Sequence, residues 1–387
     1  MINTNLPKSV YIHIPFCKSK CFYCGFFSKP VNQYDVRRVL NAEITELKKS
    51  AFQKPAQTLY IGGGSPASVG CEILCSFLSK VVELTGAAGE FTVEINPADA
   101  DEKLLKELFE LGVNRISIGV QSFCDNELAF LGRGYSAKQA EKIIGAAEII
   151  GFKNIGIDLI FAVPGSNLKN WRETIKKASR SSIQHISAYS LTYEKNTPLE
   201  KTKLSGKIKT VDEDTDRKMF EAAIRKLTDA GFEHYEISNF AKPGCQCRHN
   251  LTYWKNEHYL GIGPAAASFS GDYRIENISD IDKYVECIES DKEPAADFGE
   301  LSRGEKIKIT PSEKASQTAV LNLRLIKGID LTEYRQKTGF CFYKLFGQSI
   351  EKNLKSNLLQ LKNSRLSLTK QALPIADSVL CDFAQPD

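Results

Sequence analysis

The sequence lacks the features that mark membrane, exported and nucleic-acid-binding proteins. Its 387 residues contain no run of 18 consecutive apolar residues, so we expect no transmembrane helix. Residues 1–8 are polar and lack the apolar stretch of a secretory signal peptide. The net charge of +4 is too small for a nucleic-acid-binding surface, and we expect no nucleic-acid partner. These absences favour a cytoplasmic protein, in which a hydrophobic content of 42% suffices for a sizeable core.

Cysteine, in contrast, is plentiful, with 11 residues in the chain. Without secretion these cysteines imply a reducing compartment, where clustered cysteines bind metals more often than they form disulfides. Cys17, Cys21 and Cys24 form such a cluster, spaced Cys-x3-Cys-x2-Cys, in a polar loop after a short apolar run. Cys71 and Cys75 are different, because apolar residues surround them at helical spacing and predict a buried helix face.

Three thiolates are one short of the four ligands that a structural zinc site or a closed iron–sulfur site takes. Zinc stays an alternative, but no fourth cysteine or histidine lies close in the sequence. An open metal position is a place where a small molecule can bind and react. The cysteine loop therefore predicts a reactive metal site more strongly than a structural one.

Six short β-branched runs alternate with helical patterns along the first half of the chain. This βα order predicts a parallel sheet with crossover helices, either as a partial barrel or as a doubly wound sheet. The expected strands are Val10–Ile14, Thr58–Ile61, Phe91–Ile95, Arg115–Val120, Asn154–Leu159 and His185–Tyr189.

The ends of these strands favour the barrel. Each strand runs into a polar or glycine-rich segment, and the segments include Gly62–Pro66, Glu94, Gln121 and Asp158. In a barrel all six strand ends meet at one face, whereas a doubly wound sheet brings together only those beside its switch point. We therefore predict an α/β fold with a partial (βα)6 TIM-like barrel.

Beyond the barrel the pattern changes. We expect a loop over 194–209, a helix over 212–230 and a strand over 233–238. From about residue 301 short helices at 312–326, 330–337 and 345–361 precede a small strand pair near 366–368. The predicted domains are a core at 1–242, a connecting region at 243–299, and a small winged-helix-like C-terminal domain at 300–387.

The motifs together resemble those of the radical S-adenosylmethionine (SAM) superfamily. Tyr-x-His-x-Pro-Phe-Cys-x3-Cys-x-Tyr-Cys begins at Tyr11, Gly-Gly-Gly-Ser-Pro begins at Gly62, and Glu-x-Asn-Pro begins at Glu94. Within the superfamily the chain is similar to the oxygen-independent coproporphyrinogen III oxidases and their relatives, the HemW heme chaperones. The resemblance implies a 4Fe–4S cluster whose unligated iron is chelated by SAM, and an electron from the cluster that can cleave SAM to a radical.

The resemblance also implies roles for individual residues. Cys17, Cys21 and Cys24 would ligate the cluster. The SAM site would include Tyr11, Gly62, Gly63, Gly64, Ser65, Glu94, Gln121, Arg133 and Asp158. From the residues alone, the glycines also fit an ordinary turn, Arg133 a surface charge, and Asp158 a helix N-cap.

Two positions separate the chaperones from the oxidases. The oxidases carry a fourth cysteine two residues after the third, where this chain has Phe26, and a longer segment ahead of the cysteines. The stretch His249-Asn-Leu-Thr-Tyr253-Trp254 matches the His-Asn-x-x-Tyr-Trp signature of the chaperones. Imidazole is a common heme ligand, and the two aromatic rings could pack against a macrocycle. A buried histidine beside an aromatic pair is the plain alternative.

We therefore expect a heme chaperone that uses a 4Fe–4S cluster and SAM, with heme as cargo and no catalytic residue of its own. The rival expectation is an oxidase that decarboxylates coproporphyrinogen III. The resemblance implies as partners a heme-accepting apoprotein, which could be membrane-bound, an electron donor, and a second copy in a homodimer. Cys245 and Cys247, just before the motif, fit extra ligands, covalent heme attachment, or two unliganded thiols.

Overall fold

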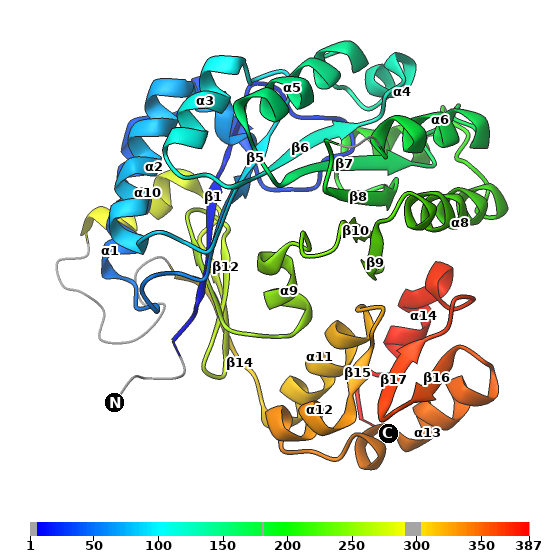
Figure 1. Cartoon of the computed structure of the whole chain (residues 1–387). Coiled ribbons are helices and arrows are strands. Elements are labelled where there is room, and N and C mark those ends of the chain that lie inside the picture. Colours follow the sequence, from blue (N-terminus) through cyan, green and yellow to red (C-terminus); the bar gives the residue numbers. More distant parts are fainter. Residues whose placement is uncertain (1–5, 180–181, 291–302, 387) are drawn as a thin grey trace.

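A partial barrel forms the upper part of the molecule in Figure 1 and is confirmed as the fold. The structure is a computed structural model that describes residues 6–179, 182–290 and 303–386. The six parallel strands of the barrel are β1 (Ser9–Ile14), β4 (Thr58–Gly63), β5 (Glu90–Ile95), β6 (Arg115–Gln121), β7 (Ile155–Phe161) and β8 (His185–Ser190). They are neighbours in chain order, without the switch point that a doubly wound sheet would have.

Helices cover the outer face of these strands (Figure 1). They are α1 (Val36–Lys49), α2 (Cys71–Thr85), α3 (Glu102–Glu110), α4 (Asp125–Phe130), α5 (Ala137–Ile150), α6 (Leu168–Ala178) and α8 (Glu213–Asp229). Polar side chains start several of them: Asp35, Asp101 and Asp212 each accept a backbone N–H bond in the first turn. Cys71 begins α2, and its side chain and that of Cys75 pack against the core, in line with the predicted helix face.

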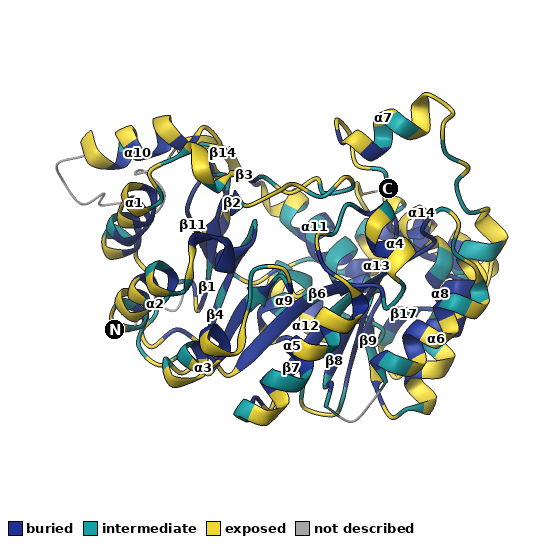
Figure 2. Cartoon of the chain, turned by 90° about the horizontal axis from the view of Figure 1, so that it is seen from above, coloured by how far each residue is buried: buried dark blue, intermediate teal, exposed yellow. Residues whose placement is uncertain are grey.

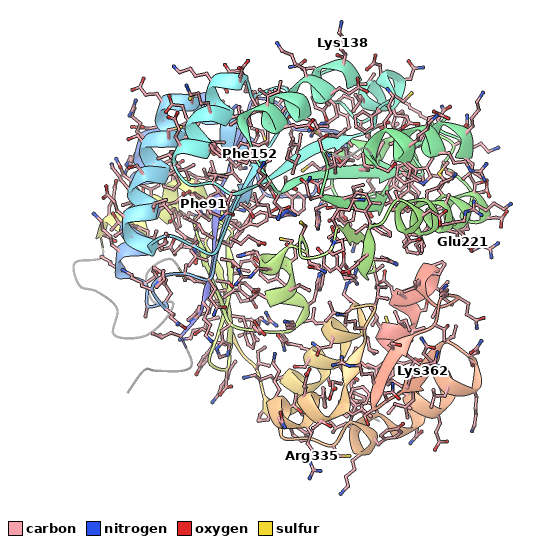
Figure 3. The ribbon with its side chains drawn as sticks, in the orientation of Figure 1. Phe91, Lys138, Phe152, Glu221, Arg335 and Lys362 are labelled. Atoms are coloured by element: carbon pink, nitrogen blue, oxygen red, sulfur yellow. The ribbon has the colours of Figure 1, made fainter. Side chains whose placement is uncertain are left out.

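Alternation along each strand separates the core from the barrel lumen. On β6, Ile116, Ile118 and Val120 are fully buried against the helices. Arg115 and Ser117 alternate with them along the strand and line the other face, the lumen. Charged side chains of the covering helices point into solvent, as Figure 3 shows for Lys138 of α5.

Further strands extend the sheet at both edges, and of these the sequence predicted only β9 (Glu233–Glu236), as the strand over 233–238. Beside β1 lie β11 (Tyr259–Ile262), which is parallel to it, and then the antiparallel strands β12 (Ala267–Ser270), β13 (Tyr273–Asn277) and β14 (Arg303–Lys308). Beside β8 lie β10 (Asn239–Ala241) and β9 (Glu233–Glu236). The region predicted to connect two domains thus contributes strands to the main sheet. The predicted boundary between residues 299 and 300 lies outside the described residues.

The C-terminal unit lies below the barrel in Figure 1. Its elements are α11 (Pro311–Leu323), β15 (Ile329–Asp330), α12 (Leu331–Thr338), α13 (Phe342–Lys355), β16 (Leu359–Lys362), β17 (Arg365–Leu368) and α14 (Ala376–Cys381). The order helix, strand, two helices and two strands is that of a winged helix. The predicted helix over 345–361 was too long, because Asn357 has a left-handed backbone and ends it before β16.

Three short elements, β2, β3 and α7, lie in the two loops beside the candidate site. Two-residue strands β2 (Phe16–Cys17) and β3 (Lys29–Pro30) pair at the base of the cysteine loop. Helix α7 (Pro198–Leu204) lies in the segment that we predicted as a loop, so that prediction was wrong in part. Thr197 is the N-cap of this helix and Pro198 is its first residue. This pair is a helix-start signal, which the prediction of a loop missed in a lysine-rich segment.

Candidate metal and cofactor site

One cavity of about 570 Å³ occupies the barrel lumen and its mouth, and most of the predicted site residues line it. The predicted residues along its wall are Cys17, Cys21, Cys24, Gly63, Gly64, Ser65, Glu94, Gln121, Arg133 and Asp158. Gly62 and Tyr11 are not among the lining residues. The structure therefore brings together three loop cysteines and the polar ends of four strands.

The cysteine loop is held to the barrel by backbone hydrogen bonds. The Phe22 N–H donates to the Leu131 carbonyl at 3.2 Å, and the Leu199 N–H of the α7 segment donates to the Phe22 carbonyl at 3.0 Å. All eleven cysteines are free thiols. Cys17, Cys21 and Cys24 are partly exposed toward the cavity, which leaves their sulfur atoms accessible.

The electrostatic surroundings of the three sulfur atoms differ. Burial raises the pKa of the Cys17 thiol to about 11, and burial also raises the pKa of Cys24. The Cys21 sulfur accepts a hydrogen bond from Arg133 Nη1 at 3.2 Å. Loading a metal onto Cys17 and Cys24 thus releases protons, as is usual for thiolate sites.

Arg133 is buried in contacts and is not the surface charge that its sequence position also allowed. Its guanidinium donates to Asn96 Oδ1 at 3.1 Å and to the Gly119 carbonyl at 2.9 Å, and its Nε donates to Tyr135 Oη at 3.0 Å. These bonds tie the cysteine loop to the ends of β5 and β6. The predicted pairing of Arg133 with the SAM carboxylate stays a prediction.

The glycine segment at the end of β4 is shaped by close backbone approach. A Cβ at Gly64 would overlap the backbone carbonyl of Phe16, one residue before the first cysteine. A Cβ at Gly62 would lie 2.9 Å from the Glu94 carboxylate, and Gly63 has a φ of +109°. Glycine is needed here because the β4 end packs against the base of the cysteine loop. The Ser65 hydroxyl donates to Asp99 at 2.6 Å.

The three polar residues at the ends of β5, β6 and β7 converge on the same lumen. Glu94 accepts a 2.8 Å hydrogen bond from Tyr60 Oη, and burial raises the pKa of its carboxyl to about 7. Asp158 accepts from Ser117 Oγ at 3.3 Å, and burial raises its pKa. Gln121 adopts a left-handed backbone with φ of 61°, a strained conformation that often marks functional sites.

Tyr11 lies behind the cavity. Its hydroxyl is hydrogen-bonded to His13 Nδ1 at 2.9 Å, and its ring packs against Tyr60 with ring centroids 6.0 Å apart. Tyr60 itself lines the cavity. Tyr11 therefore does not line the cavity, and its predicted place in the SAM site stays a prediction.

The predicted heme motif forms helix α9 (Arg248–Trp254), which lies between the barrel and the C-terminal unit (Figure 1). His249 is only 1% exposed. Its Nδ1 is hydrogen-bonded to Thr58 Oγ1 and its Nε2 to Tyr253 Oη, both at 2.8 Å. Burial lowers the pKa of His249 to about 3, so the ring is neutral. Neither nitrogen is open to iron here, and the predicted heme ligation would require breaking one of these bonds.

The neighbours of His249 are also packed. The Arg324 guanidinium of the C-terminal unit lies 4.9 Å from the centroid of the Trp254 ring. Cys247 is fully buried with its sulfur 3.7 Å from Glu90, and burial raises the pKa of this thiol to about 12. Cys245 is partly exposed. A buried neutral thiol is a poor nucleophile, so this arrangement favours an unliganded Cys247.

Sequence reasoning missed the deeper lining residues. Arg115 and Ser117 of β6, and His185 and Ser187 of β8, line the lumen below the predicted site. Each pair is spaced two apart on an otherwise apolar strand. That alternation of polar residues was the signal that could have located them.

Comparison with known proteins places the chain in a family. The model of the radical SAM superfamily matches residues 11–178, and that of the HemN C-terminal domain matches residues 309–375. The heme chaperone HemW of Bacillus subtilis is 33% identical over 97% of this chain and 99% of its own length. The heme chaperone HemW of Lactococcus lactis is 30% identical over 98% of both chains. The chain belongs to the HemW family of radical SAM proteins.

A solved structure supports the fold of this HemW family member. The coproporphyrinogen III oxidase HemN from Escherichia coli, described as a radical SAM enzyme, matches with a TM-score of 0.82. The match covers 98% of this chain and 90% of that chain at 20% identity, which is evidence for the fold alone.

Membership in the radical SAM superfamily implies a 4Fe–4S cluster and SAM as cofactors. The donor set fits a cluster, since three accessible sulfur atoms line one wall of the cavity. Within the described part of the chain, no group of three or more His, Cys, Asp or Glu side chains is arranged to hold a single metal ion. A cubane cluster needs no such arrangement, because each thiolate binds a different iron. Among residues 6–179, 182–290 and 303–386, no helix combines the length and apolar character that spanning a membrane requires.

Proposed function

We propose that this HemW family member is a heme chaperone, which binds heme and passes it to an acceptor protein. The observation that carries the proposal is the 33% identity to the heme chaperone HemW of Bacillus subtilis over nearly the whole of both chains. Phe26 supports it, because it stands where the sequence pattern of the oxidases has a further cysteine. The similarity to the oxidase structure concerns the fold and carries no activity.

In this proposal Cys17, Cys21 and Cys24 hold the cluster. When bound, the cluster supplies electrons and leaves one iron open to SAM. Arg133 positions Cys21 through its 3.2 Å contact with the sulfur. Glu94 on β5 and Asp158 on β7 are buried acceptors that line the lumen, suited to the amine and hydroxyl groups of SAM. Gln121 and the residues of the Gly62–Ser65 segment complete the proposed SAM site.

The proposed function requires partners and a location. It includes an acceptor apoprotein, which on the family likeness is a membrane-bound heme protein, a reductant for the cluster, a second copy of the chain, and residence in the cytoplasm. His249, Tyr253 and Trp254 remain the heme contacts predicted from the sequence. His249 is buried, and Tyr253 and Trp254 are partly exposed.

Two anaerobic assays of the cluster-loaded protein test the proposed function. Heme added in steps should give a saturable absorbance change with about one heme per chain. Coproporphyrinogen III incubated with SAM and reductant should be recovered unchanged. Steady formation of protoporphyrinogen, with no saturable heme binding, would instead make the chain an oxidase.

A further inference from the structure

A second cavity lies beside α9, on the side that faces the C-terminal unit. It has a volume of about 480 Å³, within the range of roughly 300–1,000 Å³ that is typical of small-molecule sites. Its lining residues come from α9, β11, β13, α11 and the segment after α14. Helix α11 lies beneath α9 in Figure 1, and Asn322 Nδ2 of α11 donates to the Trp254 carbonyl of α9 at 2.8 Å. The barrel edge and the C-terminal unit therefore build this cavity together.

The walls of this cavity are mainly apolar. Tyr253 of α9 and Tyr259 of β11 meet edge to face, with ring centroids 4.6 Å apart. Val320 and Leu321 add aliphatic surface from α11. All four residues are partly exposed, whereas Figure 2 shows the barrel strands β6, β7 and β8 as buried along most of their length. The cavity thus offers an accessible aromatic surface to an apolar ligand.

Arg274 of β13 is the one charged residue that lines this cavity within the described part of the chain. Its guanidinium lies over the Phe269 ring, 4.0 Å from the centroid, and this contact holds its plane. The guanidinium donates to Gln317 Oε1 at 3.1 Å, to Tyr259 Oη at 3.3 Å and to Asn256 Oδ1 at 2.6 Å. Among the described residues Nη1 makes only the bond to Tyr259, so the second of its two hydrogens is available to a ligand.

The positive charge of Arg274 lacks an acidic partner in the described residues. All of its hydrogen bonds go to neutral side chains. Asp272 pairs with Lys314 at 3.6 Å, and Glu276 does not line the cavity. Ser316 of α11, which lines the cavity and is 3% exposed, has no hydrogen-bond partner for its Oγ. An uncompensated guanidinium and a buried hydroxyl without a partner together favour a ligand that brings a carboxylate.

An aromatic surface with an arginine beside it suits a flat apolar molecule that bears a carboxylate. Heme, the cargo in the proposed function, has this chemistry in its macrocycle and its two propionates. The cavity also adjoins the predicted heme ligand, because His249 Nε2 is hydrogen-bonded to Tyr253 Oη at 2.8 Å. Tyr253 thus links the imidazole of His249 to the cavity wall.

We propose that Arg274 is a heme-binding residue, which holds a propionate in this cavity while the macrocycle lies against Tyr253. This inference rests on the proposed heme-chaperone function and agrees with heme at α9. It adds a residue that recognises carboxylate outside the His-Asn-x-x-Tyr-Trp motif, and it makes α11 of the C-terminal unit the second wall of the heme site. Opening of the hydrogen bond between His249 and Tyr253 would then present the imidazole to the iron of the bound heme.

Titration of anaerobically reconstituted protein with heme and with heme dimethyl ester tests the inference, because the ester has no carboxylates. Arg274→Gln should bind heme about tenfold more weakly, as expected for the loss of a charge-assisted hydrogen bond, and should bind the ester as the natural protein does. Arg365→Gln is the matched control. It removes the same charge from β17, where Arg365 already pairs with Asp330 at 3.2 Å, and it should leave both affinities unchanged.

A second variant keeps the arginine and occupies it. Gln317→Glu has nearly the same shape and places a carboxylate against Arg274, where it competes with the propionate. Heme binding should weaken about tenfold, binding of the ester should not change, and the melting temperature should not fall. Gln360→Glu adds the same charge on β16, outside the cavity, and should bind heme normally.

The outcomes separate this inference from the proposed function. If the natural protein shows no saturable heme binding, the proposed function fails. If it binds heme and both Arg274→Gln and Gln317→Glu bind heme equally well, Arg274 does not hold the propionate and the chaperone function stands. An equal loss of affinity for heme and for the ester would show that Arg274 only supports the local fold, which also contradicts the inference.

Discussion

Close backbone contacts at individual glycines determine how the β4 end packs against the cysteine loop. Gly64 is the tightest case, since any side chain there would overlap the carbonyl of Phe16 at the base of the cysteine loop. The glycine motif was recognised from the sequence, but as a place where the backbone approaches a ligand. In the structure Gly64 also lies against the backbone of Phe16 in the same chain. These residues are 48 positions apart, so one short motif could not predict their contact.

Gly64→Ala should therefore displace the cysteine loop. We expect lower iron and sulfide content after anaerobic reconstitution, and a loss of folding stability of roughly 1–3 kcal/mol from overpacking. Elemental analysis and thermal melting measure the two effects. Gly145→Ala is the control, because no atom lies within 4 Å of a Cβ placed there and the residue sits within α5. That variant should load normally and melt at the same or a slightly higher temperature.

Glu236 should make the stability of the fold depend on pH. This residue of β9 is fully buried, its Oε1 accepts from the Ser238 N–H at 3.1 Å, and its Oε2 has no hydrogen-bond partner. Burial raises its pKa from 4.5 to about 7. The folded state therefore holds the proton more tightly than the unfolded state, and this contribution to stability is complete below about pH 4 and is lost as the pH rises through 7.

Glu236→Gln removes the titration and keeps one acceptor oxygen. The free energy of unfolding of Glu236→Gln, relative to that of the natural protein, should be higher at pH 8.5 than at pH 5.5. The difference should be at most roughly 3 kcal/mol, which is the full value of such a pKa shift. Urea unfolding at the two pH values measures this. A stability difference that is the same at both values would mean that Glu236 is ionised in the folded protein across this range.

Helix α9 shows at the level of elements what the sequence could not reveal. Its motif was found at once, but its burial depends on partners far away in the chain, including Thr58 on β4 and Glu90 on β5. The same holds for β11, a four-residue strand whose pairing with β1 joins Ser9 to Tyr259. In contrast, the six barrel strands and the cysteine loop carry their own local patterns, and these were located from the sequence.

Glu90 anchors α9, because its two oxygens accept the backbone N–H groups of Arg248 and His249, both at 2.9 Å. Glu90→Gln should turn one of these acceptors into a donor and destabilise α9 by about 2 kcal/mol. Amide hydrogen exchange over residues 248–254 should become faster, with little change on α5. Glu110→Gln, at the exposed end of α3, should leave the exchange of α9 as it is. Unchanged protection of α9 in Glu90→Gln would contradict the anchoring role.

On the scale of the whole molecule, the barrel has two different ends. The mouth gathers the cysteine loop, the polar strand ends and the exposed Phe26. The other end is closed by α9, whose Trp254 ring meets Arg324 of the C-terminal unit. The proposed cofactor site thus lies in the lumen, and the C-terminal unit contacts α9 behind it.

The most direct test of this account is to count iron, sulfide and heme on one anaerobically reconstituted preparation that has been given heme and freed of excess. We expect four non-heme irons, four sulfides and one heme per chain, because three cysteines bind a 4Fe–4S cluster and the chain carries heme. A preparation that holds zinc without sulfide, or a complete cluster without any retained heme, would contradict it.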